Sequence, residues 1–404
     1  MKIRSITVFD TLDPAINADH LHDLGAFAGT ARRAYEEAGF EVQTTRLATS
    51  LFPPLMQTEW ASRPADFAAA LEAACREQGF EYVALGPAGL AILPRLPEIL
   101  AATQAVFATA HIVNPATGVI DGETIRAAAH VIHEAAHIED GFGNLRFAAL
   151  ANVLPGAPFF PAAYHDGGPA AFAIATESAD LAVAACAGTR DAADAHARLA
   201  ASVEAHAARI VAVAEKLSAS PGRRFGGIDF SLAPFPAPEI SIGAAIELLT
   251  GCPLGSAGTL TAAATLADAI DRAQFPHTGF CGLMLPVLED PVLGRRAAEG
   301  QLRIGELLQW SAVCGTGLDT VPLPGDASED ALARVLFDVA ALAVRLHKPL
   351  TARLMPLPGK AAGNPVHFDF AYFADGGVLP LDGAAETGAL AETRRLRLHP
   401  RRQA

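Results

Sequence analysis

Short apolar stretches alternate along this chain with longer segments in which apolar residues recur at the spacing of a helix. In the N-terminal third, the strand-like stretches are IRSITVF (3–9), FEVQTTRLA (40–48), FEYVALGP (80–87) and QAVFATAHIV (104–113). Helical patterns cover residues 19–39 and 64–78, and a third helical pattern follows residue 113. This succession predicts β–α units, which build a largely parallel sheet with helices on its outside.

The same rhythm resumes in the C-terminal half. Its strand-like stretches are IDFSLAPF (228–235), FCGLMLPV (280–287), LDTVPL (318–323) and LTARLMPL (350–357). The helical patterns that accompany them lie near residues 241–250, 258–271, 291–314 and 327–346. Between the two halves, the Ala-rich region over about 169–218 predicts two helices that are broken near AGTRD (187–191).

No internal repeat and no long linker divides the chain. A single α/β domain is therefore expected over residues 1–385. Residues 386–404 contain the one basic cluster and are expected to form a poorly ordered tail.

The composition narrows the class of protein. Of the 404 residues, 51% are hydrophobic and 18% are charged, which predicts a large buried core. The net charge of −14 argues against nucleic acid as a partner, because phosphate binding needs clustered Lys and Arg. The five cysteines are scattered without CxxC spacing, which is typical of free thiols in a reducing compartment. No signal peptide or membrane-spanning apolar run is found, so a cytoplasmic protein is expected, and whether it forms a homo-oligomer is left open.

The segment HEAAH contains His133, Glu134 and His137 and matches the HExxH pattern of zinc proteases. On a helix, two His four residues apart share one face, as zinc binding requires, and the Glu would be the general base. Zinc also needs a third ligand, but Asp140 and Gly143 occupy the positions where metzincins carry Gly and His. An amphipathic Ala-rich helix explains the same residues, so His133 and His137 are weak metal candidates.

A second polar group surrounds the apolar stretch RFAALANVLPG (146–156). Asn144 and Arg146 lie beside this stretch and are candidate substrate ligands, since Arg146 needs a carboxylate of the fold or an anionic substrate as its partner. His165 lies in the Pro- and Gly-bounded loop that follows, and Glu177 is expected on the next helix. Both are candidate proton carriers, because α/β proteins place chemistry in loops at strand ends. A structural ion pair beside the sheet explains these charges equally well.

A third candidate is Cys314, which ends a helical pattern at the turn GTG and precedes Asp319. Glycines on both sides of Thr316 allow backbone geometry that would expose a thiol. A thiol is catalytic only where its pKa is lowered or a base lies nearby. The alternative is a buried cysteine at an ordinary helix end.

A fourth group consists of three cations, Lys348, Arg353 and Lys360, beside the last apolar stretch. Cations at strand ends suit a carboxylate or phosphate substrate. The segment around Lys360 is no P-loop, because Leu354 stands where the motif needs Gly and Ala361 replaces Ser or Thr.

Several of these segments together resemble a family of uncharacterised proteins known as domain of unknown function seven-one-one. The blocks are GFGNLRFAALANVLPGAPFFPAAYHDG, GGIDFSLAPFP, TGFCGLMLPVLED, SAVCGTGLDTVPLPGD, KPLTARLMPLPGK and FDFAYF. They follow one another in order, and with MKIRSIT at the start the likeness covers residues 1 to about 380. The resemblance implies a fold similar to the ten-stranded α/β barrel of pyruvate formate-lyase and ribonucleotide reductase, in which two half-barrels surround a loop.

In those enzymes the tip of the loop carries a catalytic cysteine, so the resemblance implies that VCGTGLD (313–319) is this loop and that Cys314 faces the cavity. The chain departs from the radical enzymes near its C-terminus. A glycyl-radical site would need a stretch like Arg-Val-Ser-Gly-Tyr, and FADGGVLP (373–380) lacks those neighbours. The resemblance therefore implies the barrel without the glycyl radical, and the family supplies no activity.

The leading hypothesis is a non-radical enzyme that acts on a small anionic carbonyl or acyl compound at the centre of the barrel. In this hypothesis Arg146, Lys348 and Arg353 hold the anion, His165 or Glu177 moves protons, and Cys314 is a nucleophile or an acid. One alternative is a metal-dependent hydrolase or lyase, with Mg²⁺ or Ca²⁺ at Asp229, Glu177 or Asp319, or Zn²⁺ at His133 and His137. The other alternative is a small-molecule sensor without turnover. No cofactor is predicted, and a divalent metal is left open.

Overall fold

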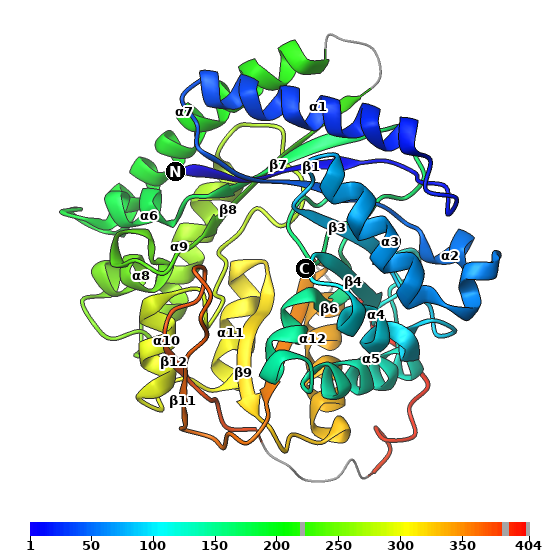
Figure 1. Cartoon of the computed structure of the whole chain (residues 1–404). Coiled ribbons are helices and arrows are strands. Elements are labelled where there is room, and N and C mark those ends of the chain that lie inside the picture. The colour runs from blue at the N-terminus through cyan, green and yellow to red at the C-terminus, as the bar shows by residue number, and fades with distance from the viewer. Residues whose placement is uncertain (219–222, 382–387, 401–404) are drawn as a thin grey trace.

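Nine strands form one mixed sheet in the order β8-β7-β1-β2-β3-β4-β6-β10-β9 (Figure 1). The computed structural model describes residues 1–218, 223–381 and 388–400. Five neighbouring strands run parallel to one another. They are β1 (Lys2–Phe9), β2 (Val42–Ala48), β3 (Tyr82–Pro87), β4 (Val106–His111) and β6 (Phe147–Ala151). The sequence predicted the first four as strands, and β6 lies within the apolar stretch 146–156, because helices cover the outer side of these strands and leave apolar runs.

The remaining strands flank this group and run antiparallel to it where they meet it. They are β7 (Ala171–Glu177), β8 (Arg224–Ala233), β9 (Gly317–Pro324) and β10 (Leu350–Leu357). β7 pairs antiparallel with β1, and β10 pairs antiparallel with β6, while β7 with β8 and β9 with β10 are parallel pairs. The rhythm of the sequence predicted an α/β fold with a largely parallel sheet. Six of the eight strand pairings are parallel, and the two antiparallel junctions make the sheet mixed.

β7 corrects the sequence analysis, which assigned residues 169–218 to helices. Its seven residues AFAIATE are all buried between β1 and β8. Alanine favours helices in isolation, but small side chains also fit a strand covered on both faces, so pairing partners far along the chain decide the conformation. The predicted break is confirmed, because α6 (Ala179–Cys186) ends just before α7 (Ala192–Ser218) begins.

The segment 277–286 touches both edges of the sheet. It forms parallel bridges to β8 through His277 and Leu283, and to Gly315 and Asp319 beside or within β9 through Leu283 and Pro286. A hydrogen bond of 2.9 Å joins the Leu283 N–H to the Cys314 carbonyl oxygen. The predicted strand over 280–287 is thus an extended segment with isolated bridges between the two edge strands.

Helices cover the outer face of the sheet, and their apolar faces pack on it to form the main core (Figure 1). The remaining helices of four or more residues, apart from short 3₁₀ turns, are α1 (Ala18–Glu37), α2 (Phe52–Leu55), α3 (Pro64–Glu77), α4 (Leu96–Ala102), α5 (Gly122–Ala135), α8 (Ile242–Thr250), α9 (Thr259–Arg272), α10 (Pro291–Ala298), α11 (Ile304–Cys314) and α12 (Glu329–Leu346). None of the helices within the described ranges is both long and apolar enough to cross a membrane.

Two small sheets complete the structure. β11 (Pro365–Val366) pairs with β12 (Gly376–Gly377), and β13 (Arg395–Arg397) pairs with β5 (Val119–Asp121). The tail was expected to be poorly ordered, but its residues 395–397 are therefore part of a sheet. Residues 386–387 and 401–404 of the expected tail lie outside the described residues.

The connection between β6 and β7 folds against the inner side of the large sheet. Phe159, Phe160 and Tyr164 of this connection are almost completely buried. The Thr7 hydroxyl of β1 donates a hydrogen bond of 2.8 Å to the carbonyl oxygen of Pro158. The inner side of the sheet is thus filled by a loop, and the space that the loop leaves open is a cavity.

Candidate active site

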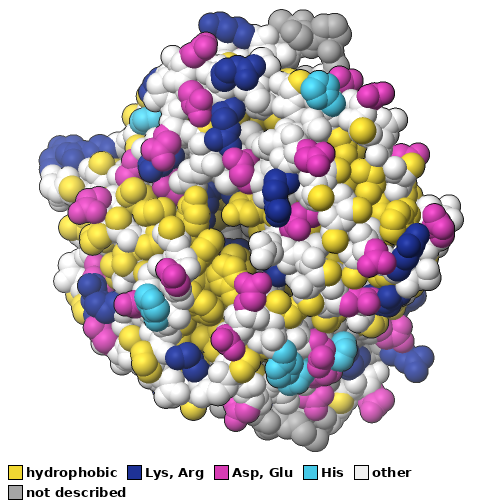
Figure 2. All heavy atoms as spheres, viewed as in Figure 1, with side chains coloured by type: hydrophobic (Ala, Val, Ile, Leu, Met, Phe, Trp, Pro, Cys, Tyr) yellow, Lys and Arg dark blue, Asp and Glu magenta, His cyan; other side chains and the backbone are white. Residues whose placement is uncertain are grey.

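The central cavity is enclosed by residues from seven strands of the large sheet, so the sheet curves around it. Its volume is about 90 Å³. Figure 2 shows a hollow at the centre of one face, with basic side chains deep inside it and hydrophobic side chains around it. The polar and charged residues of its wall are Arg4, Gln43, Thr44, Arg46, Tyr82, Glu289, Thr316, Asp319, Thr351, Arg353 and Tyr372.

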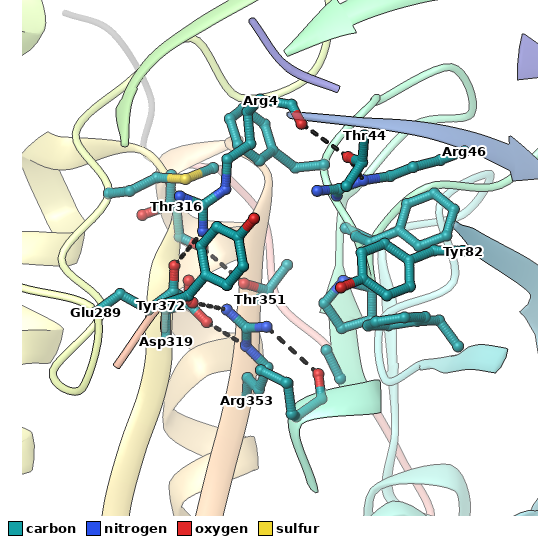
Figure 3. Close-up of a pocket in the computed structure, with 18 of the residues that line it drawn as sticks. Arg4, Thr44, Arg46, Tyr82, Glu289, Thr316, Asp319, Thr351, Arg353 and Tyr372 are labelled. Atoms are coloured by element: carbon teal, nitrogen blue, oxygen red, sulfur yellow. Dashed lines mark hydrogen bonds and ion pairs between the residues drawn. The ribbon is translucent and has the colours of Figure 1, made fainter. Parts of the chain in front are cut away.

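A chain of buried ion pairs crosses one side of the central cavity (Figure 3). Arg353 donates from Nε to Asp319 Oδ1 at 2.6 Å and from Nη2 to Glu289 Oε1 at 2.8 Å. The other oxygen of Glu289 accepts from Arg4, and Arg4 also donates to Glu177 Oε2 at 3.0 Å. The third nitrogen of Arg353, Nη1, donates to the carbonyl oxygen of Leu145, so that all three of its nitrogens are engaged. This connected network holds both guanidinium groups in fixed positions.

Irregularities in β1 and β9 turn the side chains of Arg4 and Asp319 towards the cavity. In β1 the pairing with β7 shifts between Ile3 and Ser5, which places Arg4 at a bulge. In β9 two residues, Asp319 and Thr320, lie opposite a single residue of β10, and Thr320 has a φ of 41°. A bulge redirects a side chain that regular alternation would send to the other face. A non-glycine residue at positive φ is strained, and such residues cluster at functional sites.

Burial changes the pKa of a carboxyl group in the cavity wall. Burial raises the pKa of Asp319 above its ordinary value, against the opposing effect of the neighbouring Arg353 guanidinium. Its second oxygen, Oδ2, has no hydrogen-bond partner among the described residues. Asp319 therefore holds a proton more readily than an exposed carboxyl, and one of its oxygens is free to meet a ligand.

Arg46 lies on the other side of the cavity, and no carboxylate pairs with it in the described part of the chain. Its Nε donates to the Thr44 hydroxyl at 2.8 Å, and its guanidinium carbon lies 5.3 Å from the ring centres of both Tyr82 and Phe160. The residue is 7% exposed, and burial lowers the pKa of Arg46 to about 10. The two terminal nitrogens have no protein acceptor among the described residues, so this edge of a buried cation is open to an anion.

Comparison with known proteins supplies the family. The family described as Uncharacterised ACR (DUF711) matches residues 1–371. The chain belongs to this family. A UPF0210 protein of Pyrobaculum islandicum is 31% identical over 402 residues, covering 90% of this chain and 87% of that protein. The UPF0210 protein of Pyrobaculum aerophilum is 34% identical over 301 residues, covering 70% of this chain but less than two thirds (64%) of that protein.

Two of the residues that the sequence singled out meet in the central cavity of this DUF711 chain. They are Asp319 and Arg353, which form the ion pair described above. Glu177 does not line the cavity, but it forms an ion pair with Arg4, which does. It is the last residue of β7, whereas the sequence placed it on the following helix. Its Oε1 atom is buried without a hydrogen-bond partner among the described residues.

The other predicted cations do not join Arg353 in one pocket. Arg146 donates to the carbonyl oxygen of Leu100 at 2.8 Å and to the Thr103 hydroxyl. Lys348 donates to the carbonyl oxygens of Ser311 and Ala312 at the end of α11. Both cations thus satisfy backbone groups of the fold, outside the wall of the central cavity.

The predicted ligands Asn144 and Lys360 also lie outside the cavity wall. The Asn144 amide donates to the carbonyl oxygen of Ile132 at 2.9 Å. Lys360 donates from Nζ to the carbonyl oxygen of Pro365 at 2.7 Å in a partly exposed turn. Both contacts tie loops of this chain together.

Cys314 and His165 lie away from the central cavity. Cys314 is the last residue of α11, is 1% exposed and belongs to the main hydrophobic core. Its neighbour Thr316 lines the cavity, but no cysteine of the described ranges does. His165 lines a second pocket near Phe9 and Arg224, at the opposite end of the strands β1 and β8, and its Nε2 lies 3.1 Å from the carbonyl oxygen of Gly168.

The HEAAH residues do not assemble a metal site. His133 lies on α5 and His137 lies just beyond its end, and their ring centres are 5.9 Å apart and nearly perpendicular. No three His, Cys, Asp or Glu side chains come together around one point in the ranges that the structure describes. Asp229, the other weak metal candidate, accepts hydrogen bonds from the backbone N–H groups of Phe280 and Cys281 and therefore shapes the loop around them.

Arg4, Arg46 and Glu289 line the cavity but were not predicted from the sequence. The sequence did contain a signal for the two arginines. Each is a cation within a strand-like apolar stretch, just as Arg146 is a cation at the edge of such a stretch. Nothing in the local pattern distinguishes an arginine that pairs within the wall from one that faces an open space. Only the pairing of β1 with β2, which are neighbours in the sheet, brings Arg4 and Arg46 to the same cavity.

Proposed function

We propose that this DUF711 chain is a non-radical acid–base enzyme that acts on a small anionic carbonyl compound in the central cavity. The observation that carries the proposal is the buried guanidinium of Arg46, whose terminal edge has no acceptor among the described residues. A buried cation without a partner is costly, and an anionic ligand would offset that cost. The alternatives remain a metal-dependent enzyme and a sensor without turnover.

Asp319 is the best-placed group for proton transfer within this proposal. It faces Arg46 across the same cavity, and its raised pKa brings it closer to neutral pH, where a general base or acid is most effective. Arg353 fixes Asp319 Oδ1 and leaves Oδ2 for the substrate. Tyr372, which lies over Arg4 at 5.5 Å, offers a hydroxyl for the carbonyl oxygen of the substrate.

The roles proposed for Cys314, His165 and Glu177 have less support. A nucleophile must reach the substrate, and none of these three lines the central cavity. Glu177 retains an indirect role, since it holds Arg4 and so supports the network around Asp319.

A closed ten-stranded barrel is part of the same proposal. Two groups of parallel strands, antiparallel to each other, and the bridging segment 277–286 between β8 and β9 support it. Closure would surround the central cavity with low-dielectric protein and strengthen the electrostatic interactions within it. The five free cysteines support a cytoplasmic location, and the net charge of −14 supports a small molecule rather than a nucleic acid as the partner.

Proton exchange tests this function, because the readout does not require the product to be identified. The protein is incubated in D₂O with 2-oxobutyrate as the probe, and ¹H NMR follows the protons next to the carbonyl group. Removal of such a proton gives an enolate, and return of a deuteron from solvent through the carboxyl erases the signal. We expect exchange above the background rate, and a decrease of at least about 100-fold in Asp319→Asn.

The control and the alternatives have distinct outcomes. Asp66→Asn, which changes a carboxyl in the first turn of α3, outside the central cavity, should exchange at the wild-type rate. Binding of the probe without exchange would support the sensor instead. Stoichiometric metal in protein purified without chelators, together with exchange that depends on that metal, would support the metal-dependent alternative.

A further inference from the structure

The charges around the central cavity restrict the net charge of a ligand. Three guanidinium groups, those of Arg4, Arg46 and Arg353, and two carboxylates, those of Glu289 and Asp319, line the wall, which leaves a balance of +1. Glu177 pairs with Arg4 from outside the wall, and its negative charge brings the net charge of these groups to zero. A ligand with one negative charge has Arg46 as its partner. A second negative charge would find each remaining guanidinium already paired, and it would lie near two carboxylates.

The geometry of Arg46 favours a planar anion over a tetrahedral one. The Thr44 hydroxyl accepts the hydrogen bond of Arg46 Nε, and the rings of Tyr82 and Phe160 flank the guanidinium group. A ligand therefore reaches only the edge formed by the two terminal nitrogens. Two parallel N–H groups match the two oxygens of a carboxylate. A phosphate needs further donors around it.

The threonine hydroxyl groups of the cavity do not supply those further donors. Thr44 donates to the carbonyl oxygen of Arg4, Thr316 to that of Leu283 and Thr351 to that of Thr316, at 2.8, 2.8 and 3.1 Å. All three hydroxyl protons are therefore used within the protein.

The rest of the wall is apolar and leaves little room. Its apolar members are Phe107, Leu145, Ala148, Phe159, Phe160, Pro161, Ala162, Phe280, Met284 and Phe370. The space between these side chains is about 90 Å³, which suits a small ligand. An apolar body of that size gains free energy by leaving water.

We infer that the ligand is a monocarboxylate with a short apolar body, rather than a phosphate or a dicarboxylate. This inference rests on the proposed function, since it names the class of molecule held by Arg46. The carboxylate lies on the terminal edge of Arg46, and the body extends along the aromatic wall towards Asp319.

Calorimetric titration of the full chain with a matched panel tests the inference. The probes are butyrate and 2-oxobutyrate as monocarboxylates, succinate as a dicarboxylate, inorganic phosphate, and butyramide as the uncharged analogue of butyrate. We expect the dissociation constants of both monocarboxylates to be at least tenfold lower than those of succinate, phosphate and butyramide. Equal or tighter binding of succinate or phosphate would overturn the inference and leave the anion site standing. Binding by no anion would overturn the inference and the proposed function together.

A charge variant adds a second readout. Glu289→Gln removes one carboxylate from the wall and keeps an oxygen that can accept from a guanidinium. It should bind succinate at least threefold more tightly than the wild type does, whereas Glu98→Gln on the surface should not change succinate binding. Unchanged succinate binding in folded Glu289→Gln would contradict the charge argument. If circular dichroism shows that Glu289→Gln is unfolded, Asp319→Asn makes the same change of charge, and the same criterion applies to it.

Discussion

Arg353 and Asp319 lie on the neighbouring parallel strands β10 and β9, and a hydrogen bond of 2.6 Å joins Nε to Oδ1. The pairing of the two strands shifts at this point, so Asp319 and Thr320 together lie opposite Arg353. The extra residue turns the carboxyl to the inner face of the sheet, where the guanidinium already points. The relationship explains how two charges that are distant in the sequence become the fixed wall of the central cavity.

Removing this guanidinium should destabilise the protein strongly. Arg353→Ala leaves the carboxylates of Asp319 and Glu289 buried with one partner fewer, and breaking a buried ion pair typically costs about 3–5 kcal/mol. Urea unfolding measures the change in the free energy of unfolding. Arg63→Ala, which removes an exposed arginine over Trp60, is the control and should change it by less than about 1 kcal/mol. A loss below about 1 kcal/mol in Arg353→Ala would show that the network does not support the fold.

Asp229 should make the stability depend on pH. Burial raises the pKa of Asp229 from an ordinary 3.8 to about 6, although Phe280, Cys281 and Ser231 donate hydrogen bonds to it. The folded state therefore binds this proton more tightly than the unfolded state, so this contribution to stability is largest at low pH. It is lost as the pH rises from about 4 to about 6, and it amounts to roughly 3 kcal/mol.

Comparing unfolding free energies of wild type and Asp229→Asn across this range isolates the effect. The variant should be less stable at every pH, because its amide cannot accept all of these hydrogen bonds, and the difference between the two proteins should shrink as the pH rises. A constant difference from about pH 4 to about pH 7 would assign the pH dependence to other groups. Asp66→Asn, outside the buried core, provides the reference profile.

Thiol labelling should distinguish one cysteine from the other four. Cys252 is exposed, whereas Cys75, Cys186, Cys281 and Cys314 are buried. Burial also raises the pKa of Cys75 to about 12 and that of Cys186 to about 11, which disfavours the reactive thiolate. An aromatic disulfide reagent should therefore label one thiol quickly in the native protein and all five in denaturant, and Cys252→Ser should abolish the fast phase. Fast labelling of Cys314, protected by a ligand, would restore it as a catalytic candidate.

The two histidines of the HEAAH segment should be dispensable. The His133 ring makes one hydrogen bond of 3.3 Å, to the carbonyl oxygen of Ala327, and His137 is exposed. Replacing both by Ala should leave the zinc content unchanged and alter the free energy of unfolding by no more than about 1 kcal/mol. Elemental analysis checks the first point and urea unfolding the second. Loss of stoichiometric zinc from the double variant would mean that these residues are ligands.

The sequence predicted most of the fold because its strands and helices have strong local patterns. The stretch IRSITVF became β1 and the pattern over 19–39 became α1 with small changes at the ends. β7 was missed, because its small residues are compatible with a helix and only its pairing with β1 and β8 makes it a strand.

The candidate site was harder to predict than the fold. Asp319 and Arg353 were found through the rarity of charges beside apolar strands, but the same reasoning also selected Arg146, which pairs with groups of the fold. Which charge faces the cavity depends on bulges and on contacts between distant strands. Local sequence does not encode either of these, so Arg46 emerged only from the structure.

The proposed anion site is tested most directly by the affinity of the chain for 2-oxobutyrate with and without the Arg46 guanidinium. Calorimetric titration of wild type, Arg46→Gln and the surface control Arg63→Gln gives three dissociation constants under one set of conditions. Both arginines pack against aromatic rings, but only Arg46 lines the central cavity. We predict that Arg46→Gln weakens binding by at least about 30-fold, or about 2 kcal/mol, and that Arg63→Gln binds like the wild type. Equal affinity of Arg46→Gln and wild type would contradict the proposed site, because the anion would then be held elsewhere.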